Sequence, residues 1–169
     1  MFEKILVPVD FSQYEDEILK YAKELAGKFS SSIDLLHVIP NMDYFTPYES
    51  FMAAENIVAV QKGVESEVER DLAEVAKKLP EFRVKTAMRT GVAFVEILDY
   101  VRTESIDLII MGTRGRGGLE HIIIGSVAAV MPAAARHSFR MNQLKLIARS
   151  NSTWAFICSR LRRSPARSS

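Results

Sequence analysis

Apolar residues along this chain fall into short unbroken runs separated by longer stretches with helical spacing. The short runs predict buried strands over residues 5–9, 32–39 and 106–111, because branched apolar runs of this length are typical of parallel sheets. A more polar run over residues 83–88 predicts a strand at the edge of the sheet. The pattern therefore indicates four strands with helical segments between them.

Apolar positions spaced three and four residues apart predict the helices. The first helix is expected to begin after Ser12, since Ser12 and Glu15 fit a capping box and residues 15–17 are acidic. The second covers residues 51–79 and ends at Pro80. The third has its apolar face on Phe94, Ile97, Leu98 and Val101.

This alternation of strands and helices predicts an α/β fold, an open twisted parallel sheet with helices on both faces, Rossmann-like and of the adenine-nucleotide-binding type. Strands 5–9 and 106–111 should be neighbours, which makes the point between them the topological switch of the sheet. Asp10, Val38 and the glycine-rich segment from Met111 onward would then meet at one crevice.

Two polar residues near the strand ends have ordinary alternative explanations. Asp10 also suits a turn-capping role. His37 lies alone in an apolar strand, where a histidine is usually structural, and with His121 and His137 it does not form a recognisable metal set.

The glycine-rich segment contains a G-x2-G-x9-G-S pattern made by Gly112, Gly115, Gly125 and Ser126. Bare backbone N–H groups at a turn from strand to helix can bind a phosphate. The segment is not a Walker A loop, and Glu120 occupies the sixth position of a dinucleotide fingerprint begun at Gly115. A surface turn rich in glycine and arginine is the alternative interpretation.

Residues 111–119 and 125–128 together resemble the nucleotide loop of the universal stress protein family, in its ATP-binding branch. Residues 4–12 resemble the first strand and turn of that family, and residues 36–38 resemble the end of its second strand. The resemblance covers residues 1 to about 128.

The resemblance implies an ATP site with Mg²⁺ bridging phosphate oxygens and waters. Asp10 and Val38 would hold the adenosine end, and Gly112 would lie beside the ribose. Residues at the strand ends complete that part of the site: Pro8, Val9 and Met111. The phosphates would meet the backbone of the loop residues Gly115, Arg116, Gly125, Ser126 and Val127.

A role in stress response or regulation follows from the same resemblance. Fast phosphoryl transfer needs a carboxylate that holds metal and a group that positions the nucleophile, and Asp10 alone is expected near the crevice. We therefore assign no catalytic residues and expect slow ATP hydrolysis at most. An ATP-hydrolysing or nucleotidyl-transferring enzyme on the same fold is one alternative, and a non-nucleotide interaction module is another.

Length and composition fit this picture. The chain has 169 residues, 48% hydrophobic and 25% charged, which suits one ordinary domain. Apolar runs reach nowhere near the roughly 18 residues of a membrane span, and Cys158 is the single cysteine, which excludes an internal disulfide. A cytoplasmic location without membrane contact is expected.

Charge divides the chain into a domain over residues 1–128 and an atypical basic tail over residues 129–169. All 21 acidic residues lie within residues 1–120, whereas residues 121–169 carry eight Lys or Arg and no acid. A change of reading frame near residue 128 explains this loss, and sequencing the coding DNA there tests it. A genuine basic tail that binds nucleic acid or membrane is the rival. We prefer the frame change and expect no DNA binding.

The family's fifth strand is therefore predicted to be missing or replaced. Apolar runs over residues 144–148 and 154–158 are the candidates to replace it. The resemblance implies that the fifth strand commonly carries the dimer contact, so a family-like homodimer is doubtful. We also expect the strand over residues 106–111 to expose one hydrogen-bonding edge, with lower stability as the result.

Overall fold

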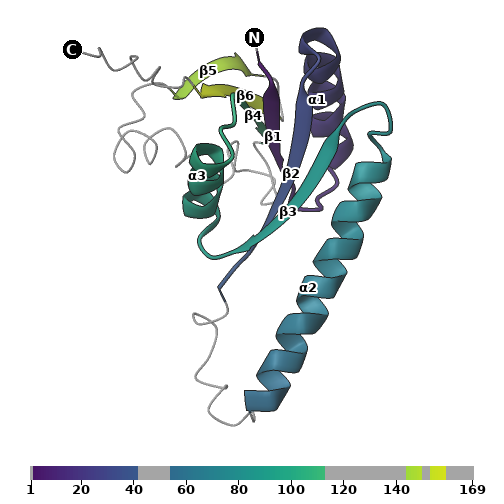
Figure 1. The fold of residues 1–169 in the computed structure, drawn as a ribbon, viewed down its shortest axis with the longest axis vertical. Helices are drawn as coiled ribbons and strands as arrows, with labels where there is room; N and C mark the ends of the chain where they lie inside the picture. The colour runs from purple at the N-terminus through teal and green to yellow at the C-terminus, as the bar shows by residue number, and fades with distance from the viewer. Residues whose placement is uncertain (1, 42–53, 113–143, 150–152, 159–169) are drawn as a thin grey trace, which may run out of the picture.

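The computed structural model describes residues 2–41, 54–112, 144–149 and 153–158. Its elements in chain order are β1 (Lys4–Pro8), α1 (Glu15–Phe29), β2 (Ser32–Ile39), α2 (Ala54–Lys77), β3 (Val84–Thr90), α3 (Ala93–Thr103), β4 (Leu108–Gly112), β5 (Leu144–Arg149) and β6 (Thr153–Cys158), as Figure 1 shows. The first four strands agree with the predicted ones to within two residues at each end. Residues 51–53, predicted to begin the second helix, lie outside the described residues.

The strands form one sheet in the order β3-β2-β1-β4-β6-β5. β1 is parallel to β2 on one side and to β4 on the other, so the predicted switch point between β1 and β4 is confirmed. β3 is parallel to β2 and lies at the edge of the sheet, as its polar sequence predicted.

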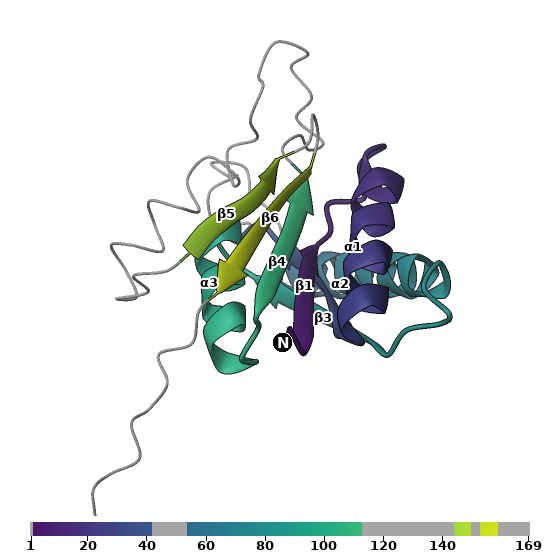
Figure 2. The same ribbon diagram turned by 90° about the horizontal axis from the view of Figure 1, so that it is seen from above.

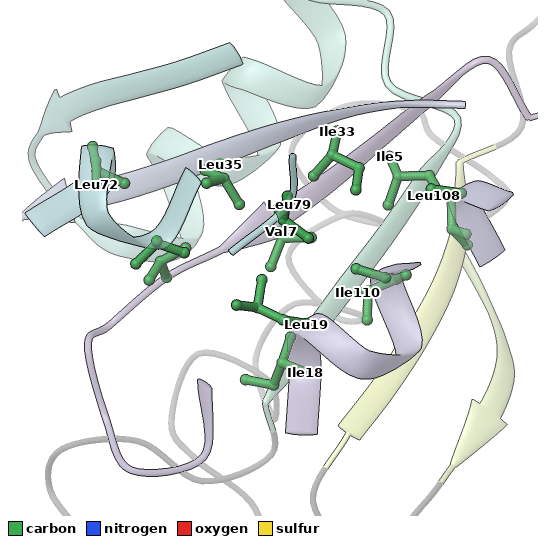
Figure 3. Packing of buried hydrophobic residues seen from close by; sticks show 14 of the residues in the cluster. Ile5, Val7, Ile18, Leu19, Ile33, Leu35, Leu72, Leu79, Leu108 and Ile110 are labelled. Carbon is green, nitrogen blue, oxygen red and sulfur yellow. The ribbon is translucent and has the colours of Figure 1, made fainter. Parts of the chain in front are cut away.

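Helices cover both faces of the sheet, which confirms the predicted fold class. α1 and α2 lie on one face and α3 lies on the other (Figures 1 and 2). Because side chains alternate along a strand, Ile5 and Val7 pack under α1 and α2, whereas Leu6 packs under α3. Figure 3 shows the first of these two cores, where buried side chains of β1, β2 and β4 meet α1 and α2.

Asp107 fixes the start of β4 and ties it to the N-terminus of the chain. Its carboxylate accepts backbone N–H groups from Glu3 at 2.9 Å and from Lys4 at 3.1 Å. Ile106 is buried, but its N–H donates to Val101 at the end of α3 instead of joining the ladder. The strand therefore begins at Leu108, two residues later than its apolar run predicted.

The predicted capping box at the start of α1 is wrong. The helix begins at Glu15, its N-cap residue is Tyr14, and no side chain caps it. The Ser12 carbonyl accepts the Glu15 N–H at 3.1 Å, and the Glu15 carboxylate instead pairs with Lys78 at 2.9 Å. A turn before the helix, described below, displaces Ser12 from the capping position.

The expectation that β4 exposes an edge is also wrong. β6 pairs antiparallel with β4 along its whole length, from Leu108 opposite Ile157 to Gly112 opposite Thr153. β5 in turn pairs antiparallel with β6. The two apolar runs named as candidates are thus the strands that extend the sheet beyond β4. An open β4 edge leaves backbone N–H and C=O groups unpaired, and β6 satisfies them.

Candidate functional site

The carboxyl ends of β2, β1 and β4 meet at one edge of the sheet. Pro8 at the end of β1 is level with Leu36 on β2, and Val9 continues the ladder by donating to the Leu36 carbonyl at 2.8 Å. Leu6 is level with Ile109, so the ends of β1 and β4 reach the same height. The structure therefore brings Pro8, Val9, Asp10, Val38, Met111 and Gly112 to this edge, where open α/β sheets bind ligands.

The loop after β1 is held in a strained conformation. Phe11 has a φ of +55°, in the left-handed region that bulky residues rarely adopt. One oxygen of Asp10, Oδ1, accepts the Ser12 N–H at 3.1 Å, which is the turn-capping role considered from the sequence. The buried Ser12 Oγ has no hydrogen-bond partner among the described residues. Strain and an unsatisfied polar atom are features that cluster at functional sites.

A small hollow adjoins this loop. Its lining consists of Val7, Pro8, Val9, Asp10, Glu15, Ile18 and Leu19, from β1 and the start of α1. The hollow is partly open to solvent and far too small to enclose a ligand.

His37 braces the same loop from β2. Its Nδ1 lies 2.7 Å from the Val9 carbonyl oxygen, and its ring stacks on Phe11 with centroids 4.6 Å apart and 26° between the planes. The sequence predicted a structural histidine, and these contacts agree. Sequence reasoning missed Phe11, because nothing in the pattern signals a left-handed phenylalanine.

The side chains of Val38 and Met111 are already used in packing. Met111 is buried in the core on the α3 face, and Val38 packs partly buried against that core. What these two residues can offer a ligand is their backbone. A planar base recognised through backbone groups fits this arrangement.

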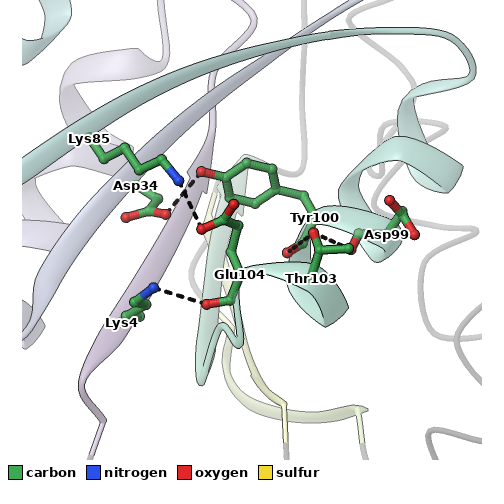
Figure 4. A network of polar contacts seen from close by, with 7 residues as sticks. All are labelled: Lys4, Asp34, Lys85, Asp99, Tyr100, Thr103 and Glu104. Atoms are coloured by element: carbon green, nitrogen blue, oxygen red, sulfur yellow. Dashed lines mark hydrogen bonds and ion pairs between the residues drawn. The ribbon is translucent and has the colours of Figure 1, made fainter.

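A second polar cluster lies between the sheet and α3, away from the carboxyl edge of the sheet (Figure 4). Asp34 on β2 is buried, and the Tyr100 hydroxyl donates to its Oδ2 at 2.9 Å. Burial, and then the charge of Asp34, raise the pKa of Tyr100, so its hydroxyl keeps its proton. Lys85 pairs with Glu104 at 2.8 Å, and its ammonium group lowers the pKa of that half-buried carboxyl. This cluster anchors α3 to the sheet.

The predicted phosphate-binding residues cannot be compared with the structure. Gly115, Arg116, Gly125, Ser126 and Val127 lie outside the described residues. Within the described part of the chain, no group of three or more His, Cys, Asp or Glu side chains is arranged to hold a metal. No described helix is long and apolar enough to cross a membrane.

Comparison with known proteins decides the family. The sequence profile of the universal stress protein family matches residues 1–136. The chain belongs to the universal stress protein family. The match ends within the basic tail, eight residues beyond the point at which the sequence resemblance was expected to stop.

Two relatives from Methanocaldococcus jannaschii illustrate the similarity. Universal stress protein MJ0531 is 32% identical over 130 residues, which are 76% of this chain and 74% of that protein. Universal stress protein MJ0577 is 31% identical over 140 residues, covering 75% of this chain and 86% of that protein.

Solved structures give the same fold. The structure of MJ0577 superposes with a TM-score of 0.68 at 29% identity and covers 79% of this chain and 90% of its own. Universal stress protein UspA from Lactobacillus plantarum superposes with a TM-score of 0.59 at 24% identity, covering 82% and 93% of the two chains. The second likeness supports the fold alone.

Proposed function

We propose that this universal stress protein binds ATP at the carboxyl edge of β2, β1 and β4. The observation that carries the proposal is the convergence of the Asp10 loop, Val38 and Met111–Gly112 at the switch point of the sheet. The adenosine end of the nucleotide lies between the Asp10 loop and Val38, with its ribose beside Gly112. The backbone groups at these strand ends suit this end of the ligand.

The phosphates meet the backbone N–H groups of the glycine-rich loop. This role is proposed for Gly115, Arg116, Gly125, Ser126 and Val127. Mg²⁺ is held mainly by phosphate oxygens and waters, which is usual for this ion at nucleotide sites. The described residues offer no cluster of carboxylates that would hold it without the nucleotide.

We propose that binding serves regulation or stress resistance and not rapid turnover. Asp10 is the acidic residue at the end of β1, and one of its oxygens already accepts the Ser12 N–H. Such a group is poorly placed to hold a metal or position a nucleophile for phosphoryl transfer. Hydrolysis of ATP well above background, abolished in the Asp10→Ala variant, would instead indicate an enzyme.

Thermal unfolding with and without Mg-ATP tests the proposal. ATP at a hundred times its dissociation constant should add roughly 2.7 kcal/mol to the free energy of unfolding and raise the melting temperature. The Gly115→Val variant should unfold like the parent without ATP and show a reduced shift with it. Because one universal stress protein of this fold, at 14% identity, was solved in complex with cAMP, cAMP belongs in the comparison. An unchanged melting temperature with every nucleotide would overturn the proposal.

We also propose that the protein is cytoplasmic and does not form a family-like homodimer. β6 covers the edge of β4 that a family-like fifth strand would occupy, so a dimer built on the family's pattern is not expected here. Light scattering on the purified chain checks this expectation directly.

A further inference from the structure

The ladder between β1 and β2 ends in an irregular way. Val9 donates its N–H to the Leu36 carbonyl, and the next bond of a regular parallel ladder would run from the Val38 N–H to the Val9 carbonyl. Among the described residues no such bond joins Val38 to Val9. The Val9 carbonyl oxygen is instead 2.7 Å from Nδ1 of His37. The partner of the Val9 carbonyl is therefore the side chain of His37 and not the backbone N–H of Val38.

The proton on His37 follows from its partner. A carbonyl oxygen only accepts hydrogen bonds, so Nδ1 carries the proton and donates it. Phe11 stacks against the same ring, and its left-handed φ is unfavourable for a bulky residue. A strained residue persists where its surroundings hold it, and here the His37 ring is one of its contacts.

The irregular end of the ladder determines what the Val38 backbone can bond to. Backbone groups two residues apart on a strand point to the same side, and the Leu36 carbonyl points toward β1. The Val38 N–H and C=O therefore also point to the β1 side, beyond the last residue of that strand. In a regular ladder the Val38 N–H would donate to the Val9 carbonyl, which His37 holds, and the Val38 C=O would accept from the Phe11 N–H. Neither ladder bond is present among the described residues.

We infer that His37 is a positioning residue for the base of the bound nucleotide. Its ring holds the Val9 carbonyl and stacks on Phe11, and so keeps the Val38 N–H and C=O available as a donor and an acceptor for the edge of a purine. The inference rests on the proposed function, because a bound base is what uses the two groups. His37 itself touches the loop and not the ligand.

Replacing the ring tests this role. In His37→Leu the Val9 carbonyl is free to accept the Val38 N–H, so the ladder gains one bond and hydrogen exchange of the Val38 amide slows. Affinity for adenosine and for ATP should fall about tenfold, the size expected for one hydrogen bond. Affinity for magnesium tripolyphosphate, which lacks the base, should not change. His37→Asn keeps a side-chain N–H near Nδ1 and should restore adenosine affinity to within about threefold.

A variant at the opposite edge of the sheet separates positioning from general stability. Ile106 is buried just before β4, at the amino edge, and Ile106→Ala destabilises the fold without touching the loop. In that variant the ratio of adenosine to tripolyphosphate affinity should stay at the parent value.

The outcomes separate the two proposals. A parent chain that binds neither adenosine nor ATP overturns the proposed function and this inference with it. A parent that binds ATP, combined with unchanged Val38 exchange and unchanged adenosine affinity in His37→Leu, overturns the positioning role alone. Equal losses of adenosine and tripolyphosphate affinity also overturn it, because they would assign His37 a merely structural role.

Discussion

Asp34 is a carboxylate buried on β2, and a tyrosine of α3 makes its burial tolerable. An unpartnered polar or charged group in a protein interior is costly, so such groups are nearly always hydrogen-bonded. Tyr100 supplies the bond at 2.9 Å, and its own ring lies 5.6 Å from the Lys85 ammonium and 5.9 Å from the Arg89 guanidinium. The pair links α3 to the sheet and fixes the face opposite α1 and α2.

Removing the Tyr100 hydroxyl should be costly. We expect Tyr100→Phe to lower the free energy of unfolding by roughly 1–3 kcal/mol, because Asp34 loses a partner while it stays buried. Urea denaturation measures the change. In the double variant Asp34→Leu with Tyr100→Phe the cost should be smaller, since no polar group is stranded. A double variant that loses the sum of both single effects would contradict this explanation.

The same pair gives a pH dependence at the alkaline end. Because the pKa of Tyr100 is raised in the folded protein, its stabilising effect is complete below the unfolded value of about 10. Above that pH the unfolded chain releases the proton first, so stability falls as pH rises. The parent should lose stability above pH 10 more steeply than Tyr100→Phe. Parallel curves for the two proteins would argue against the raised pKa.

For single residues, the sequence predicted which element holds a polar side chain better than it predicted which residue that side chain contacts. Asp34 is visible as a polar residue inside an apolar run, but Tyr100 lies 66 residues away and meets it through the packing of α3. Ser12 and Glu15 satisfied a local capping rule, yet the turn at Phe11 and the distant Lys78 determined their contacts. A local sequence pattern cannot predict a hydrogen-bond or ion-pair partner that belongs to a distant element of the fold.

At the scale of elements, the turn from β3 to α3 depends on one glycine. Gly91 has a φ of +149°, and its N–H donates to the Ile39 carbonyl at 2.9 Å, which joins the ends of β2 and β3. A Cβ at this position would be 2.8 Å from Oε1 of Glu96 in the first turns of α3. The backbone conformation therefore favours glycine, and an added Cβ would also make the Glu96 side chain shift.

Gly91→Ala and Gly63→Ala should have opposite effects. Gly91→Ala should lower the free energy of unfolding by about 1–3 kcal/mol through backbone strain and the contact with Glu96. Gly63 lies inside α2, and a Cβ added there would meet nothing within 4 Å, so Gly63→Ala should raise stability by about 0.5–1 kcal/mol. Chemical denaturation of the two variants measures both changes in the free energy of unfolding. Equal effects would show that glycine's conformational role at residue 91 is unimportant.

The order of the elements was predictable because each rule behind it is local or topological. Apolar runs located β1, β2 and β4, and the alternation with helices placed β1 between β2 and β4. That order alone brings Asp10 and Val38 to one edge of the sheet. The strain at Phe11 and the hydrogen bond from His37 to Val9 were not predictable, because they depend on how the loop settles against β2.

At the scale of the whole molecule, β5 and β6 extend the sheet beyond β4, so that β4 is not an edge strand. β6 lies between β4 and β5, so its backbone groups are shared between two ladders. The sequence located both strands as candidates, but it could not predict that they pair, since neither run follows the βαβ pattern of the preceding strands. Antiparallel pairing needs no crossover helix, which suits a short connection of residues 150–152.

A proline in β6 tests the contribution of β5 and β6. Ala155 is opposite Ile110 of β4 and opposite Ala148 of β5, so Ala155→Pro removes an N–H from a strand with a neighbour on each side. The free energy of unfolding should fall by about 1–3 kcal/mol, and the chain should aggregate more readily as the β4 edge opens. Ala155→Gly keeps the N–H and should cost less than about 1 kcal/mol. Equal free energies of unfolding for the proline and glycine variants would mean that β5 and β6 contribute little to stability.

The position of β1 between two distant partners governs how the chain can be assembled. β1 meets β2 some thirty residues later, but its other neighbour begins at Leu108, and the N–H groups of Glu3 and Lys4 bond to Asp107. During synthesis from the N-terminus, β1 and β2 form first while one side of β1 stays open. The centre of the sheet is completed only after more than a hundred residues have left the ribosome. Until then the nascent protein carries an unpaired apolar strand, and this is the interval in which a chaperone is of most use to it.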